Sequence, residues 1–239
     1  MYGIEVTDWL GLFWFLLCWS CYAHFARTRA LQTASLASVM NRHRVNWMSR
    51  MLQREARMSD ASLLGNLERN VTFFASSCVL ILAGLLTALS AVDKVVSVLG
   101  SFSFAAEADT LSVELKMATL IGVFIYAFFT FTWSMRQYGF ACALVGAAPA
   151  VNDNTVTAAE RRSFVIYAAK VIDQASRTYN YGLRSLYFSL SVLAWFFHPL
   201  LFTLSSVIIV FVLYRREFHS DSLYALKKVE GIETRLFSD

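Results

Sequence analysis

Charge and proline are both scarce in this chain of 239 residues. Only 16% of the residues are Asp, Glu, Lys or Arg, and two are proline, whereas an average soluble domain has about 25% charged residues. The shortage of charge is concentrated in four apolar windows, and the segments between them are basic. Few prolines suit a helical chain, because proline interrupts a helix. These absences argue against an ordinary soluble domain and predict helices that cross a membrane.

The four apolar windows predict transmembrane helices at about 9–25, 71–92, 117–135 and 186–214. A helix needs about 20 residues to cross the hydrocarbon core, so the first window is near the lower limit. A retained span is favoured there over a signal peptide, because Glu5 and Asp8 precede it in place of a basic stretch. We therefore expect an all-α polytopic membrane protein of about four transmembrane helices with long cytoplasmic helical extensions, forming one membrane domain over residues 1–239.

The fourth window is interrupted by His198 and Pro199. A single helix over 186–214 would be about 43 Å long, more than the core of about 30 Å requires. Because proline removes a helix hydrogen bond, we predict a kink at this point. The alternative is a hairpin of two short helices that turns at the same place. A single span leaves the C-terminus outside the cell, whereas a hairpin returns it to the cytoplasm.

The distribution of lysine and arginine predicts the orientation. Basic residues crowd the segments 26–70 and 136–185, whereas the stretch between the second and third windows holds only Lys94 and Lys116 beside four acidic residues. By the positive-inside rule, the two long segments are cytoplasmic and the N-terminus is outside.

Both cytoplasmic segments contain helical patterns. In the first, apolar residues recur at helical spacing with a break near His43, and five arginines occupy the other faces. Such a basic amphipathic helix either lies on anionic lipid headgroups or packs on its own protein or a neighbouring subunit. Cytoplasmic loops of membrane proteins are rich in arginine in any case, so these arginines do not indicate nucleic-acid binding, and we expect none. In the second segment, Thr157 and Glu160 form a capping-box pattern that predicts the start of a long helix. The apolar stripe of the first segment consists of Leu36, Val39, Met40, Trp47, Met48, Met51 and Leu52.

Polar residues gather near the predicted cytoplasmic ends of three spans. Two segments that lead from a cytoplasmic stretch into a span share a pattern, in which Asn66 and Asn70 correspond to Asn180 and Arg184. This similarity leaves open whether the chain contains a true internal repeat. Arg136 ends the third predicted span. Polar groups at this depth are unfavourable unless they are paired, hydrated or functional. We predict that these five residues line a cytoplasm-facing polar cup for an anion or a lipid headgroup. The alternative is that they only snorkel to the interface and cap helix ends.

No motif indicates catalysis or a resident metal. Cys18, Cys21 and His24 offer three ligands where structural zinc takes four, and there is no Walker loop, GxSxG or HExxH. No Asp or Glu lies inside a predicted span, which disfavours a proton- or sodium-driven carrier. We expect no enzyme activity, no cofactor and no metal site.

Five stretches of the chain carry a family resemblance. They are NVTFFASS (70–77), FIYAFFTFTWSMRQYGF (124–140), GAAP (146–149), YNYGLRSLYFSLSVLAWFFHP (179–199) and LYRREFHS (213–220). They resemble an uncharacterised bacterial membrane-protein family, the domain-of-unknown-function family 599. The resemblance covers most of the chain and implies a multi-span helical protein of the bacterial inner membrane, without an activity to carry over. Gly139 departs from the family pattern, because we would expect a polar residue after Arg136-Gln137-Tyr138.

Two functions fit these observations. The first is a homo-oligomeric channel or carrier with the basic polar mouth, because a ring of subunits encloses a polar path more easily than four helices do. The second is a non-catalytic accessory or scaffold subunit of a larger membrane complex, held by aromatic-rich spans and anionic lipid. Expected partners are therefore anionic headgroups together with further copies or a membrane-complex partner. The residues expected to line a pore are Thr72, Ser76, Ser77, Ser189 and Ser191.

Overall fold

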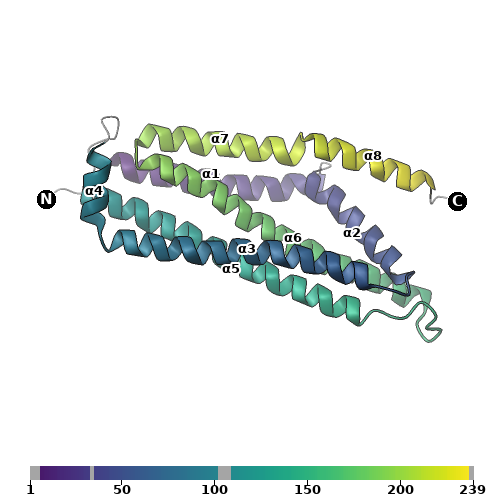
Figure 1. Cartoon of the computed structure of the whole chain (residues 1–239). Helices are drawn as coiled ribbons and strands as arrows, with labels where there is room; N and C mark the ends of the chain where they lie inside the picture. The colour runs from purple at the N-terminus through teal and green to yellow at the C-terminus, as the bar shows by residue number, and fades with distance from the viewer. Residues whose placement is uncertain (1–5, 33–34, 102–108, 237–239) are drawn as a thin grey trace. The chain divides into compact units, whose positions relative to one another are not determined.

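A computed structural model describes residues 6–32, 35–101 and 109–236 (Figure 1). Within these ranges the chain forms eight helices and no strand, so the predicted all-α class is confirmed. The helices are α1 (Val6–Gln32), α2 (Leu36–Leu52), α3 (Met58–Leu89), α4 (Val92–Gly100), α5 (Thr110–Gly146), α6 (Ala158–Trp195), α7 (Pro199–Phe218) and α8 (Asp221–Leu236).

Four stretches of the described chain are long and apolar enough to cross a membrane, and they overlap the four windows predicted from sequence. The protein is therefore an all-α polytopic membrane protein. The helices extend well beyond the charge-free windows, because a helix continues into polar surroundings wherever its own hydrogen bonds are kept. The four stretches are Val6–Ala26, Met58–Leu89, Thr110–Gly146 and Pro199–Gly231.

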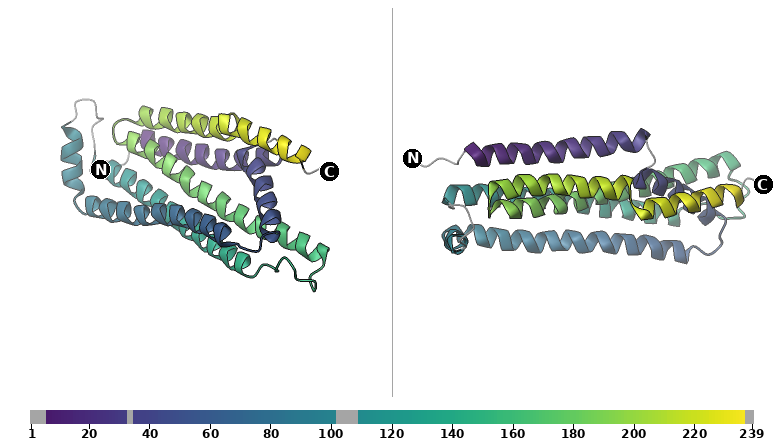
Figure 2. Two further views of the ribbon diagram at one scale, coloured as in Figure 1. Left: turned by 45° about the vertical axis from the view of Figure 1, so that its right-hand side comes forward. Right: turned by 90° about the horizontal axis from the view of Figure 1, so that it is seen from above.

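The predicted single helix over 186–214 is corrected to two helices. α6 ends at Trp195 and α7 begins at Pro199, and the chain reverses between them (Figures 1 and 2). Pro199 takes the first position of α7, where its missing N–H is not needed and its fixed φ suits a helix. The His198 Nδ1 atom accepts a hydrogen bond from the backbone N–H of Leu200 at 3.1 Å, and this bond caps the start of α7. The reversal at His198 and Pro199 matches the hairpin alternative, but the two helices are not short, since α6 has 38 residues and α7 has 20.

Contacts divide the chain into two compact units. The membrane unit comprises the described residues of 1–28, 75–129 and 181–215, and the loop unit comprises those of 29–74, 130–180 and 216–239. The loop unit thus combines both long basic segments with the C-terminal helix α8.

Helix α8 packs on α2 within the loop unit. Arg42 of α2 forms an ion pair with Glu230, and a ring nitrogen of His43 lies 3.3 Å from the carbonyl oxygen of Leu226. The C-terminal helix therefore lies beside the first basic segment, as the hairpin alternative requires.

Stacked aromatic rings fill the interior of the membrane unit. Phe15, Phe188 and Phe202 are fully buried, and the rings of Trp195 and Phe202 stack with centroids 4.4 Å apart. Such close packing fills this part of the interior with apolar side chains.

Two of the five predicted pore-lining residues belong to this interior. Ser189 and Ser191 are buried, and their hydroxyls donate to the carbonyls of Leu186 and Phe188 in their own helix at 2.8 and 2.7 Å. Because both side chains are buried within a single copy, the structure argues against the pore-lining prediction for these two residues.

The amphipathic segment of the loop unit is one uninterrupted helix, and the gap in its apolar pattern near His43 does not break it. Ser35 and Ser38 form a capping box at its start, and Val39, Met48 and Met51 are fully buried. The apolar stripe is therefore covered by the chain itself, as the self-packing alternative predicted.

The predicted capping box at the start of α6 is confirmed. The backbone N–H of Thr157 donates to Glu160 Oε2 at 2.8 Å, and the N–H of Glu160 donates to Thr157 Oγ1 at 3.3 Å. The hydrogen bond from the Thr157 backbone lowers the pKa of Glu160. A carboxyl with a lowered folded-state pKa stabilises the fold above its ordinary pKa, and this stabilisation is lost as pH falls through the lowered value.

Candidate functional site

Helix α3 carries one face that the described part of the chain leaves uncovered. Asn66, Asn70, Phe73, Leu80, Gly84 and Thr87 are all exposed, Phe73 to 67% and Leu80 to 78%. Each follows the previous one by three, four or seven residues, so all six lie along one side of the helix. We call this set the α3 face.

A basic residue adjoins the polar end of the α3 face. Arg69 is exposed, follows Asn66 by three residues and donates a hydrogen bond to the Asn66 side-chain oxygen. A guanidinium beside two amides supplies several N–H donors, the groups that bind small anions. Arg69 is not among the residues predicted from sequence. Its spacing from Asn66 can be read from the sequence, but the positive-inside rule alone already accounts for an arginine at this position.

The exposed face of α7 provides a contrast. Leu200, Leu204, Ile208 and Phe211 are between 50% and 72% exposed, and all are apolar. That composition is typical of a surface that contacts lipid tails. The α3 face differs because it also contains asparagine, threonine and glycine. Gly84 has no atom within 4 Å of the place where a Cβ would be, so another helix could approach closely there.

The three other residues predicted for the polar cup are placed as follows. Arg136 of α5 is exposed in the loop unit, with its guanidinium 5.8 Å from the Phe140 ring, and Asn180 of α6 is half-buried in the same unit. Arg184 belongs to the membrane unit, where its guanidinium lies 5.3 Å from the Tyr22 ring. A joint cup of these residues with Asn66 and Asn70 stays a prediction.

A family model described as "Protein of unknown function, DUF599" matches residues 10–222. The chain belongs to the DUF599 family. The DUF599 match contains the α3 face, both long basic segments and most of all four candidate spans. It confirms the resemblance drawn from the sequence and carries no activity with it. No curated protein and no solved structure matches the chain.

Within this DUF599 protein, several arginines of the loop unit hold its segments together. Arg44 donates to Asp173 Oδ1 at 2.7 Å and to Ser176 Oγ at 2.6 Å, which joins α2 to α6. Burial lowers the pKa of Arg44, and the Asp173 carboxylate opposes that effect by favouring the charged form. Arg57 donates to the carbonyls of Ala148 and Pro149. These arginines are explained by structure and need no anion.

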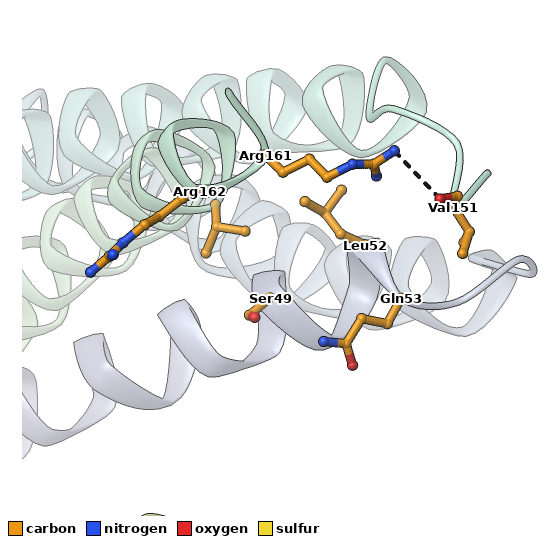
Figure 3. Close-up of a pocket in the computed structure, with 7 residues that line it drawn as sticks. Ser49, Leu52, Gln53, Val151, Arg161 and Arg162 are labelled. Carbon is orange, nitrogen blue, oxygen red and sulfur yellow. Dashed lines mark hydrogen bonds between the residues drawn. The ribbon is translucent and has the colours of Figure 1, made fainter. Parts of the chain in front are cut away.

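A groove of about 550 Å³ lies between α2 and the start of α6 (Figure 3). Two arginines line the groove, but the Arg161 side chain points toward the turn at Val151, and the Arg162 side chain points in the opposite direction. Arg161 donates to the carbonyls of Ala150 and Asp153 at 2.9 and 2.8 Å. The two cations therefore do not converge, and we do not assign an anion site here. The groove is lined by Ser49, Leu52, Gln53, Val151, Arg161, Arg162 and Val165.

The candidate spans are longer than the predicted windows and contain acidic residues such as Asp8, Asp60 and Glu114, contrary to the sequence prediction. Asp8 is in α1 and only 4% exposed. Its Oδ2 accepts a hydrogen bond from Ser112 at 2.5 Å, its Oδ1 accepts one from the Trp195 indole at 2.7 Å, and the Lys116 ammonium lies 3.8 Å away. The partners come from α5 and α6, so their meeting could not be seen in the linear sequence. Both carboxylate oxygens of Asp8 have hydrogen-bond donors, so we interpret this cluster as a structural contact that holds α1 against α5 and α6.

No group of three potential metal ligands occurs in the described part of the chain.

Proposed function

We propose that this protein is a homo-oligomeric channel for a small anion, in which several copies surround a path lined by their α3 faces. The observation that supports this proposal is the exposed α3 face itself. It combines asparagine, threonine and glycine along a helix that is long and apolar enough to span a membrane.

The aromatic filling of the membrane unit argues for a path between copies. Buried rings such as Phe15 and Trp195 occupy the interior of a single copy. An exposed glycine in a span favours close contact with another helix, because small residues let two backbones approach. Gly84 has such an open surface, and contact between copies there would bring the α3 faces together.

The polar end of the α3 face supports anions as the permeating species. Arg69, Asn66 and Asn70 would repeat in every copy and form a ring of N–H donors. Phe73 and Leu80 follow on the same side of the helix, and hydrophobic rings of this kind restrict flow by excluding water. The expected path therefore has a polar mouth and a hydrophobic constriction.

Oligomer formation can be tested at Gly84. We expect Gly84→Leu to shift the protein in mild detergent from a multimer to a smaller species, because the added side chain blocks close helix contact. Light scattering coupled to size-exclusion chromatography measures the mass. Gly122→Leu is the matched control, because Gly122 is also exposed in a candidate span with no atom within 4 Å of the place for a Cβ. A monomeric wild type would contradict the proposal.

Ion selectivity can be tested at the polar end. In planar bilayers with a chloride gradient, we expect a reversal potential that indicates anion preference and moves toward zero in Arg69→Gln. We also expect Phe73→Ala to raise conductance several-fold, because it shortens the hydrophobic constriction. Arg162→Gln, a change at an exposed arginine of α6, is the control. Electrical silence of both wild type and Phe73→Ala would overturn the channel proposal.

A scaffold role is the second candidate, and the loop unit supports it. Arg42 and Arg44 tie α2 to α8 and α6, so the unit would present a firm surface to a partner. Native purification separates the two proposals. A stoichiometric partner protein that stays bound through purification favours the scaffold, whereas a homo-oligomer alone favours the channel.

A further inference from the structure

An apolar groove of about 520 Å³ runs between α1 and α7 in the membrane unit. Its volume is within the range of small-ligand sites, about 300–1,000 Å³. Nearly all of its lining is carbon, and its open side carries exposed residues such as Leu17 and Phe211. Because both helices belong to candidate spans, the medium facing this groove is the hydrocarbon of the bilayer.

One end of the groove is aromatic, and two arginines adjoin the residues that line it there. Tyr22, Phe25 and Tyr214 line it there, and the rings of Phe25 and Tyr214 lie 6.0 Å apart. The Arg184 guanidinium lies 5.3 Å from the Tyr22 ring, and the exposed Arg215 follows Tyr214 in the chain. Tyrosine and arginine at the end of an apolar surface are typical of the level at which lipid headgroups lie.

We propose that this groove binds one acyl chain of an anionic phospholipid, whose phosphate lies beside Arg184. The apolar lining of the groove suits a hydrocarbon chain, and a guanidinium can donate paired N–H groups to phosphate. The first basic segment follows α1 at this end, and Arg215 and Arg216 lie in the last turn of α7. Anionic lipid is enriched where such basic segments meet a membrane. The proposal is independent of the channel proposal, because it concerns a different face.

The test measures thermal unfolding of the full-length protein in mild detergent with added lipid. We expect phosphatidylglycerol to raise the melting temperature by several degrees more than phosphatidylcholine with the same acyl chains. Arg184→Gln should lose most of that difference, and Arg184→Lys should retain part of it. Val207→Trp fills the groove at a lining residue that is 45% exposed, so it should weaken the effect of both lipids. Arg162→Gln serves as the control and should respond as the wild type does.

Three results would overturn the proposal. The first is equal stabilisation by both lipids in the wild type, and the second is a full effect of phosphatidylglycerol on Val207→Trp. The third is an equal effect of inorganic phosphate alone, which would indicate a simple anion site. A second copy of the chain is the competing occupant of the groove. Cys21 lines the groove and is exposed, so cross-linking through this thiol tests whether two copies meet there. Cross-linking of Cys21 between copies that phosphatidylglycerol does not suppress would assign the groove to a second copy.

Discussion

Replacing Asp8 by alanine is expected to lower the free energy of unfolding by about 3–5 kcal/mol, the usual effect of breaking a buried ion pair. The change takes the carboxylate away from Lys116, which is only 6% exposed. It also removes the acceptor of the buried Trp195 indole N–H and of the Ser112 hydroxyl. Buried donors without an acceptor each add about 1–3 kcal/mol of destabilisation.

Thermal unfolding of the purified protein in detergent measures this effect. Asp93→Ala changes an exposed aspartate of α4 and is the control, with an expected change within about 0.5 kcal/mol. The double variant Asp8→Ala with Lys116→Met should be more stable than the sum of the single changes predicts, because it removes both members of the pair. An Asp8→Ala protein that melts at the wild-type temperature would show that the cluster does not lock the membrane unit.

Replacing Asp173 by alanine is expected to have an effect of similar size in the loop unit, again about 3–5 kcal/mol. Asp173 is 6% exposed and accepts from Arg44 at 2.7 Å and from Arg177 at 2.6 Å. The Arg44 side chain is only 13% exposed, so its guanidinium would lose a carboxylate partner in surroundings that water reaches poorly. We expect α2 to loosen from α6, because Arg44 joins these two helices.

Limited proteolysis with trypsin reports on this loosening, since cleavage in α2 should become faster in Asp173→Ala. The matched control is Arg177→Ala, which removes the other partner of the same carboxylate. The Arg177 side chain is 45% exposed, and exposed ion pairs contribute only about 0–1 kcal/mol. If the two variants are cut at the same rate, then the Arg44–Asp173 pair is not what holds α2.

Several features followed from sequence because their causes are local. Apolar windows long enough to cross a membrane predicted the spans, and the capping box at Thr157 and Glu160 predicted the start of α6. Helical periodicity also placed Asn66, Asn70 and Phe73 on one side of a helix. It could not show that this side of α3 is exposed, because exposure depends on which other helices pack nearby.

The interruption at His198 and Pro199 marks the limit of sequence reasoning most clearly. The local chemistry of proline implied a break in the helix, but a kink and a reversal satisfy that chemistry equally well. The contacts of Trp195 with Phe202 and of α8 with α2 distinguish them, and both join residues from different helices.

The class of protein, the approximate spans, the basic segments and the membership of a family without an assigned activity could all be read from the sequence. Those properties depend on composition and on neighbours along the chain. The folded arrangement was needed to show that Asp8 is buried against Lys116, that Arg44 pairs with Asp173, and that the described chain leaves the α3 face uncovered. Each of these depends on side chains brought together from distant helices, and the energy of burying a charge or leaving a face open is set by those distant partners.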